Sequence, residues 1–311
     1  MVVNLFFEDE LEEIATRGSV MKKDIQILVN ALRKLNMARG KREYEDELEE
    51  KQYQLAKKLE ALTGKPAKVK LIFFKFPALK NINCIFQQKS PVMPDFGNIS
   101  FNKDTNETVQ NRQALQEYLK NYGLNAWSEC YQVHKDDLLF NPCETKLHEK
   151  ANNEYDGLAT DKKGLGLLIK TADCQPILIA DKNEQHIMAL HVGWRGNKCD
   201  FILSAIKKFC DKYKLEPQNL FAVRGPSLGP EKSEFINFNK EWGDNYLKWF
   251  DKENKTMNLW HLTNHQLQIS GIPYNHIYNI DLCTASLNND FFSYRKDKTN
   301  FRQANIIWIN T

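Results

Sequence analysis

Long apolar runs are missing from this 311-residue sequence. No stretch approaches the roughly 20 apolar residues that a membrane-spanning helix needs, so we expect no membrane partner. The sequence begins MVVNLFFEDELEE, which turns acidic at once. This start lacks the basic residues and apolar core of a secretory signal peptide. We therefore expect a cytoplasmic protein.

A disulfide framework is missing as well. The cysteines are odd in number and scattered at positions 84, 130, 143, 174, 199, 210 and 283, which is not the pattern of a secreted disulfide-rich domain. Short metal signatures such as C-x-x-C or H-E-x-x-H do not occur. The formal net charge is only +3, and this small excess gives no reason to expect nucleic acid as a partner.

The composition is that of an ordinary globular protein, with 42% hydrophobic residues. Its length allows one large domain and an accessory segment. Predicted helices and strands are intermixed without strict alternation, which favours the α+β class. We expect a mixed β-sheet core flanked by helices, in a layered α/β/α arrangement, over residues 67–311. A first core strand is expected from Val69, and a helix over residues 106–122.

Residues 1–66 differ from the rest because they contain helical patterns and no strand signal. Apolar residues at helical spacing form one stripe over residues 25–35 and another over 48–62, with Gly40 between them. Gly64 and Pro66 would end the second helix. We predict a helical hairpin extension that packs on the rest of the protein or on a second copy, which would give a homo-oligomer.

Three residues could form a reactive site: His134, Cys174 and His191, in the segments YQVHKDD, KTADCQPILIAD and MALHVGWRG. Each lies at the end of an apolar run or inside one, and we expect His134 at the end of a strand. Two imidazoles and one thiolate suit zinc and leave its fourth tetrahedral position open, as in catalytic sites. The residues alone also allow a nucleophilic cysteine, or a buried cysteine with no reactive role.

The segment from His191 to Arg195 is predicted to turn from a strand into a helix. Phe201, Ile202, Ala205, Ile206 and Phe209 follow at helical spacing. Such a turn presents free N–H groups that favour an anion, and the guanidinium of Arg195 adds a planar fork suited to phosphate.

Several of these segments resemble the laccase-domain family, also called YfiH-like or polyphenol-oxidase-like proteins. The resemblance rests on KTADCQPILIAD and ALHVGWRG, with YQVH upstream. It continues through GNIS at 97–100, QNRQAL at 110–115, GPSLGPEKSEF at 225–235 and FFSYRKDKTNFRQANIIWI near the end. It covers roughly residues 75–311.

The resemblance implies a zinc-dependent purine nucleoside phosphorylase with adenosine deaminase activity, whose partners are a purine nucleoside and phosphate. It places the zinc ligands at His134, Cys174 and His191. Asp173 corresponds to the family's acid–base carboxylate.

The resemblance also assigns substrate- or phosphate-binding roles to Asn98, Arg112 and Arg302, and it makes Arg195 a catalytic residue that faces substrate or phosphate. The sequence departs from the family pattern at Lys135, where glycine is usual. It departs again at Phe301–Gln303, where the family usually has Gly-Arg-Met.

Two other functions stay open. One is a copper polyphenol oxidase, since two histidines and one cysteine also suit copper, although a laccase needs more copper ligands than this sequence offers. The other is a cysteine- or zinc-dependent amidase-type hydrolase acting on peptidoglycan precursors, with Cys174 as nucleophile and His191 as base.

Overall fold

The computed structural model describes residues 69–101 and 106–311. The helical hairpin predicted over residues 1–66 lies outside the described residues. The α+β class is confirmed, because helices and strands are intermixed and each large sheet contains both parallel and antiparallel pairs. In the described part of the protein, no helix is long and apolar enough to cross a membrane.

Most strands belong to two sheets. The five-stranded sheet has, in order, β1 (Leu71–Phe74), β2 (Ile82–Gln87), β13 (Gln303–Ile309), β6 (Leu165–Thr171) and β3 (Ala126–Ser128). The six-stranded sheet has β12 (Ile277–Asn279), β9 (Leu220–Arg224), β7 (Gln175–Asp181), β8 (Ile187–Val192), β5 (Gly157–Thr160) and β4 (Leu138–Phe140). A separate ribbon joins β10 (Phe250–Asp251) to β11 (Thr256–Met257).

The helices lie between and beside these strands. The α-helices are α4 (Asn106–Lys120), α5 (Trp194–Lys198), α6 (Phe201–Tyr213), α7 (Phe238–Glu241), α8 (Leu259–Ile269) and α9 (Tyr294–Asp297). Short 3-10 helices are η1 (Pro94–Gly97), η2 (Pro217–Asn219), η3 (Pro230–Lys232), η4 (Asp244–Trp249) and η5 (Tyr274–His276).

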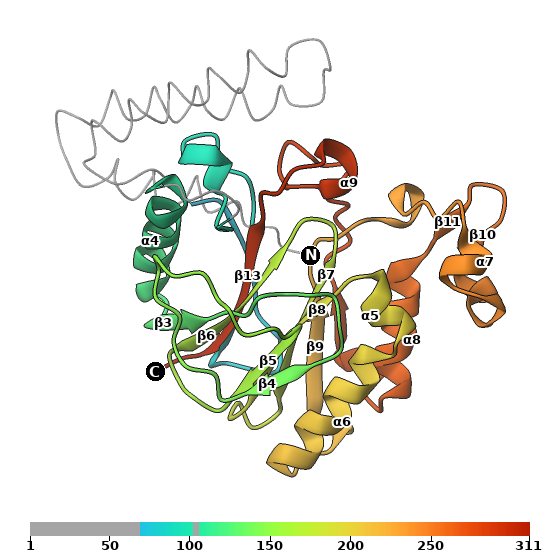
Figure 1. Ribbon diagram of the computed structural model, residues 1–311. Helices are drawn as coiled ribbons and strands as arrows, with labels where there is room; N and C mark the ends of the chain where they lie inside the picture. Colours follow the sequence, from blue (N-terminus) through green and yellow to red (C-terminus); the bar gives the residue numbers. More distant parts are fainter. Residues whose placement is uncertain (1–68, 102–105) are drawn as a thin grey trace.

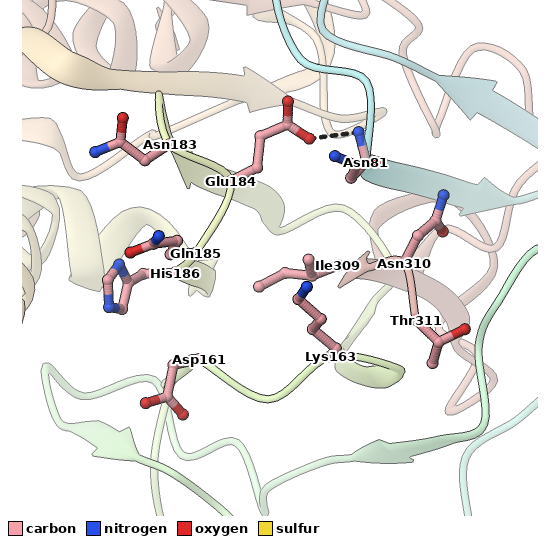
Figure 2. Close-up of a pocket in the computed structure, with 10 residues that line it drawn as sticks. All are labelled: Asn81, Asp161, Lys163, Asn183, Glu184, Gln185, His186, Ile309, Asn310 and Thr311. Carbon is pink, nitrogen blue, oxygen red and sulfur yellow. Dashed lines mark hydrogen bonds between the residues drawn. The ribbon is translucent and has the colours of Figure 1, made fainter.

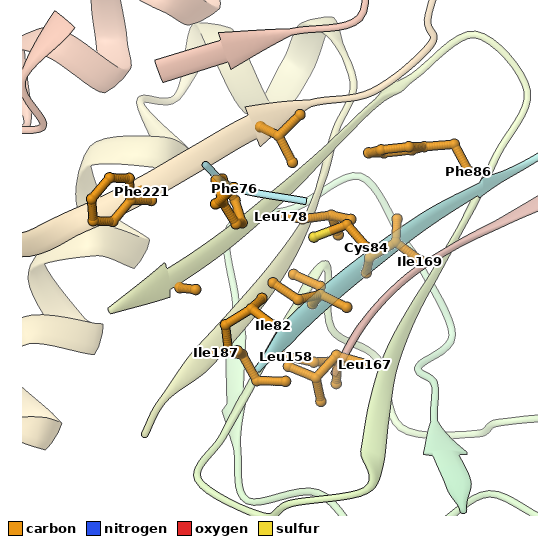
Figure 3. Packing of buried hydrophobic residues seen from close by; sticks show 14 of the residues in the cluster. Phe76, Ile82, Cys84, Phe86, Leu158, Leu167, Ile169, Leu178, Ile187 and Phe221 are labelled. Carbon is orange, nitrogen blue, oxygen red and sulfur yellow. The ribbon is translucent and has the colours of Figure 1, made fainter. Parts of the chain in front are cut away.

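The two sheets pack face to face, so the β layer is double and the arrangement is α/β/β/α. Strand residues point alternately to opposite faces: Leu167 and Ile169 of β6 face the inter-sheet core, while Leu168 belongs to the cluster on the outer face. The inner cluster contains side chains of both sheets, among them Phe86 and Leu178, which are labelled with other members in Figure 3. The mixed β core expected from the sequence is therefore built from two packed sheets.

Helices cover the outer face of each sheet (Figure 1). The expected helix over residues 106–122 is α4, which buries Leu115 and Leu119 against Trp308 of the five-stranded sheet. The apolar stripe predicted from Phe201 to Phe209 is buried along α6, against the six-stranded sheet.

One end of the two sheets gathers the segments that carry the predicted site. Here β6 ends at Thr171, β7 begins at Gln175 and β8 ends at Val192. Pro176 is the register partner of His191. The break predicted at Asp173–Cys174 is confirmed as the bend between β6 and β7.

The prediction that His134 lies at the end of a strand is wrong. The strand β3 stops at Ser128, and His134 lies in a bend with a positive φ of 61°. The N–H groups on both sides of this residue donate to the carboxylate of Asp156 and not to a neighbouring strand.

Gly225 provides a test of how closely the sheets approach. A Cβ atom at Gly225 would lie 2.1 Å from the ring of Phe86 and 2.9 Å from Pro176. Phe86 is fully buried, so its ring has no free space into which it could move.

Gly225→Ala should lower the free energy of unfolding by about 1–3 kcal/mol, as overpacking does, measured by urea denaturation. Gly196→Ala is the matched control, because its nearest neighbour would lie at 3.5 Å. Equal stability of the two variants would contradict the packing described.

Candidate metal centre

His134, Cys174 and His191 converge although they come from three separate segments. Their ligand atoms all lie within 4.8 Å of one another, and the described residues hold no second group of this kind. The Sγ of Cys174 lies 3.7 Å from Nε2 of His134, and the two imidazole centroids are 4.7 Å apart. His191 is buried, Cys174 is half-buried and His134 is exposed. The cluster is therefore open on the side of His134.

Gly193 leaves the space in which the cluster forms. It follows β8 and precedes α5. A Cβ atom here would lie 3.1 Å from the Sγ of Cys174 and 3.1 Å from the ring of His134. Any larger residue at this position would press on two of the three donors, so glycine is needed for close approach.

The carboxylate of Asp156 holds both imidazole-bearing segments. Its Oδ1 lies 2.7 Å from Nδ1 of His191, which directs the other ring nitrogen to the cluster. Its Oδ2 accepts the backbone N–H groups of Val133 and Lys135, on either side of His134. Asp156 is fully buried. A carboxylate behind a histidine ligand is a common outer partner in metal sites.

Sequence reasoning missed Asp156. The residue stands before β5 in the segment EYDGLAT, 35 positions from His191. Nothing local marks a carboxylate whose partners are so distant. The apolar strand that follows, which predicts a buried end, was the only available signal.

Charges within the cluster stabilise an ion pair when no metal is bound. Burial raises the pKa of Cys174, but the charge of His191 and hydrogen bonds from both histidines outweigh it and lower this pKa to about 6. Burial lowers the pKa of His191, but the Cys174 thiolate and Asp156 outweigh it and raise this pKa to about 9. A thiolate is the form of cysteine that binds metal or attacks a substrate.

Asp173 lies beside the cluster in the bend, with a φ of 94°. Its Oδ1 accepts from the hydroxyl groups of Thr284 and Ser293, both at 2.7 Å. Its Oδ2 accepts the N–H of Arg295 at 2.5 Å. Asp173 thereby ties the Cys174 bend to the segment around α9.

The remaining predicted residues lie in two places. Arg195 is exposed on α5, with its guanidinium 4.4 Å from the ring centroid of Trp194. Asn98 is buried, and its Oδ1 accepts the N–H of Arg302 at 2.9 Å. Asn98 therefore stabilises the loop before β13, and Arg195 is separate from it.

Arg112 and Arg302 lie on the α4 side of the five-stranded sheet. Arg112 is fully buried and pairs with Glu129, and its burial lowers its pKa to about 10. Arg302 donates to the carbonyl oxygens of Thr299 and Phe301. Burial lowers the pKa of Arg302, while the nearby charges of Cys174 and Asp173 oppose that shift. Arg302 is thus close enough to the cluster for electrostatic interaction.

A polar cavity of about 550 Å³ lies at the opposite ends of the strands (Figure 2). Its lining includes Asp161, Lys163, His186 and the end of β13, with Ile309 as the one apolar residue. Ligand pockets are usually mostly apolar. Glu184 uses its carboxylate there to cap the N–H groups of Lys80 and Asn81. We therefore consider this cavity a solvated surface feature, separate from the cluster of His134, Cys174 and His191.

Comparison with known proteins identifies a family that matches this chain and solved structures with a similar fold. Residues 90–310 match the family model described as "Multi-copper polyphenol oxidoreductase laccase". "Purine nucleoside phosphorylase YfiH" of Shigella flexneri is 30% identical over 59% of this chain and 73% of its own length. The crystal structure of YlmD from Geobacillus stearothermophilus has a TM-score of 0.65 at 22% identity and covers 79% of this chain and 98% of its own. A Bacillus licheniformis YfiH structure has a TM-score of 0.62 at 20% identity, covering 74% of this chain and 93% of its own.

Asp156→Asn should weaken zinc binding by about 10- to 100-fold, the usual cost of losing an outer-shell partner. The amide offers only one acceptor oxygen, so it cannot serve both His191 and the His134 bend. Competition with a chromogenic chelator would measure the affinity. Asp161→Asn is the matched control, because Asp161 is exposed and lies at the opposite end of the sheets. A folded Asp156→Asn variant that binds zinc as tightly as the unchanged protein would contradict the role of Asp156 in positioning His134 and His191.

Metal-free protein should react with iodoacetamide at Cys174 with a half-maximal rate near pH 6, since its pKa is lowered to about 6. The thiolate persists above that pH and is lost below it. Peptide mass spectrometry would follow the labelling, and zinc should protect Cys174. The exposed Cys143 is the internal control, which zinc should leave unprotected. A Cys174 rate that rises only near pH 8.5, as for an ordinary thiol, would contradict the ion pair.

Proposed function

Because this chain belongs to the multi-copper polyphenol oxidoreductase laccase family, we propose that it is a zinc-dependent purine nucleoside phosphorylase with adenosine deaminase activity. Relatives that carry the name purine nucleoside phosphorylase support the first activity. The family includes enzymes, and the deaminase activity and the metal are part of our proposal.

The observation that carries the proposal is the open cluster of His134, Cys174 and His191. Two nitrogen donors and one sulfur donor fit zinc, and three protein ligands leave one position for an oxygen of substrate or water. The fit is supported by the space beside Gly193 and by the ring orientation that Asp156 imposes on His191. When bound, zinc supplies a Lewis acid that polarises an oxygen group.

In phosphorolysis a phosphate oxygen attacks C1′ of the ribose, the bond from C1′ to the purine nitrogen breaks, and the free base takes up a proton. The protein's own residues would bind and orient the two substrates, which is a large part of such catalysis. Among the arginines predicted as site residues, Arg302 is the one whose charge interacts with Cys174 and Asp173. We therefore propose that Arg302 binds the phosphate.

Asp173 is the expected proton donor by family resemblance. Three protein donors already occupy its carboxylate: the hydroxyls of Thr284 and Ser293 and the N–H of Arg295. These contacts favour a positioning role, in which Asp173 holds the Cys174 bend. We therefore propose Asp173 as a positioning residue of the site.

We further propose that residues 67–311 form the catalytic domain and that residues 1–66 lie outside it. The family match over residues 90–310 lies within the proposed domain.

One observation favours a second candidate, a cysteine hydrolase. The side chains of Cys174, His191 and Asp156 form a series of thiolate, imidazole and carboxylate. Nδ1 of His191 lies 2.7 Å from Oδ1 of Asp156. This order is that of a nucleophile, its base and an orienting acid. A hydrolase of this kind would keep its activity after chelation of metal and lose it on alkylation of Cys174.

Copper oxidase chemistry is less well supported, because a multi-copper site needs more ligand groups. Within residues 69–101 and 106–311 there is one cluster of three or more metal-binding residues.

Zinc-loaded protein incubated with inosine and phosphate should release hypoxanthine and ribose-1-phosphate, and with adenosine it should also release inosine. Chromatography of the products would measure both activities. Cys174→Ala should lose zinc and at least 100-fold in turnover, whereas the matched variant Cys143→Ala, at an exposed thiol, should retain both. Full zinc occupancy without turnover of either nucleoside would refute the proposal. Turnover of an amide substrate by metal-free protein would establish the hydrolase instead.

A further inference from the structure

A cluster of positive charge adjoins the metal centre on the α4 side of the five-stranded sheet. It contains Arg112 of α4, Lys170 of β6 and Arg302, which precedes β13. Lys170 is the register partner of Ala304, so the ends of β6 and β13 bring Lys170 and Arg302 close together. Lys170 was not among the residues expected from the sequence.

One carboxylate serves two of these cations. The oxygens of Glu129 contact the guanidinium of Arg112 and the ammonium of Lys170. Glu129 and Arg112 have side-chain exposures of 1% and 0%, whereas Lys170 has 16%. The triad therefore has one positive charge in excess, and Lys170 is the member that reaches solvent.

Arg302 adds a third positive charge, on which the charge of Asp173 acts. Its Nη1 donates to two backbone carbonyl oxygens, and among the described residues it forms no ion pair with a carboxylate. A purely structural salt-bridge network would balance its charges, because buried unpaired charge is costly. Three cations, Arg112, Lys170 and Arg302, therefore face two carboxylates, those of Glu129 and Asp173. The excess of positive charge indicates an anion from outside the protein.

The cluster is joined directly to the segments of the metal centre. The side-chain amide of Gln132 accepts the N–H of Lys170 at 2.9 Å and donates to the carbonyl oxygen of Lys170 at 2.7 Å. Gln132 stands two residues before His134, and Lys170 stands four residues before Cys174. The charge of Arg302 acts on Cys174 as well as on Lys170.

We propose that Lys170 and Arg302 bind the phosphate co-substrate beside the metal centre, with Glu129 positioning Lys170 and Arg112 balancing Glu129. The inference rests on the proposed phosphorylase function and names a residue of that site. An ammonium and a guanidinium together provide the charge-assisted donors that a phosphate dianion accepts.

The environment of Lys170 is consistent with an anion at this place. Burial and the neighbouring cations, Arg112 first among them, lower the pKa of Lys170 to about 7. A bound dianion would restore the charged ammonium.

Steady-state kinetics of zinc-loaded Lys170→Met would test the inference. The KM for phosphate should rise about 10- to 100-fold, the effect of losing one charge-assisted hydrogen bond. The KM for inosine and the zinc content should change less than twofold. Lys170→Arg should restore much of the phosphate affinity. Lys163→Met is the matched control, an exposed lysine at the opposite cavity, and should leave all three values unchanged.

Calorimetric titration of inorganic phosphate into zinc-loaded protein, without nucleoside, separates this inference from the proposed function. Phosphate binding that Lys170→Met or Arg302→Gln weakens tenfold supports the subsite even if no nucleoside is cleaved, and then the phosphorylase proposal alone fails. Unchanged phosphate binding and KM in folded Lys170→Met, or no phosphate binding by the unchanged protein, would overturn the subsite. Should Lys170→Met unfold, Lys170→Arg and Arg302→Gln carry the same comparison.

Discussion

The buried carboxylate of Asp156 is the contact on which the site depends. One oxygen fixes the ring of His191, and the other holds the bend that presents His134. The backbone carbonyl oxygen of Asp156 also accepts the N–H of His191 at 2.7 Å. A single residue thereby aligns two donors from segments that are far apart in sequence. His134 has a positive φ. Without the carboxylate of Asp156, the N–H groups on either side of His134 would lose the acceptor that takes the place of a neighbouring strand.

The double sheet explains why such a site can be rigid. The inter-sheet core and the two outer helical layers hold the ends of β6, β7 and β8 in register. On one side a buried polar network fixes the first turn after β8: Asn197 of α5 bonds Gln175, next to Cys174, and Thr263 and Gln266 of α8. On the other side the triad of Arg112, Glu129 and Lys170 supports the approach to the centre. These buried hydrogen bonds and ion pairs restrict the movement of the segments that they join.

Much of this could be predicted from the sequence, and the failures have physical causes. Helical spacing identified α4 and the buried stripe of α6, and the break at Asp173–Cys174 was visible because small and polar residues interrupt an apolar run. The number of sheets was not visible, since a strand buried on both faces looks alike whether a helix or another sheet covers it. The bend at His134 was missed because its hydrogen-bond partner is the carboxylate of Asp156, a residue 22 positions away. Convergence of the three donors was proposed from residue chemistry and family resemblance, and the geometry is consistent with it.

X-ray absorption at the zinc edge would test the central claim most directly, because it reports the atoms bound to the metal in solution. The account predicts one sulfur at about 2.3 Å, two imidazole nitrogens at about 2.0–2.1 Å and one further oxygen at a similar distance. Cys174→Ser should remove the sulfur signal, and addition of phosphate or nucleoside should alter only the oxygen shell. A zinc shell without sulfur, or one closed by four protein ligands, would contradict a catalytic zinc at His134, Cys174 and His191.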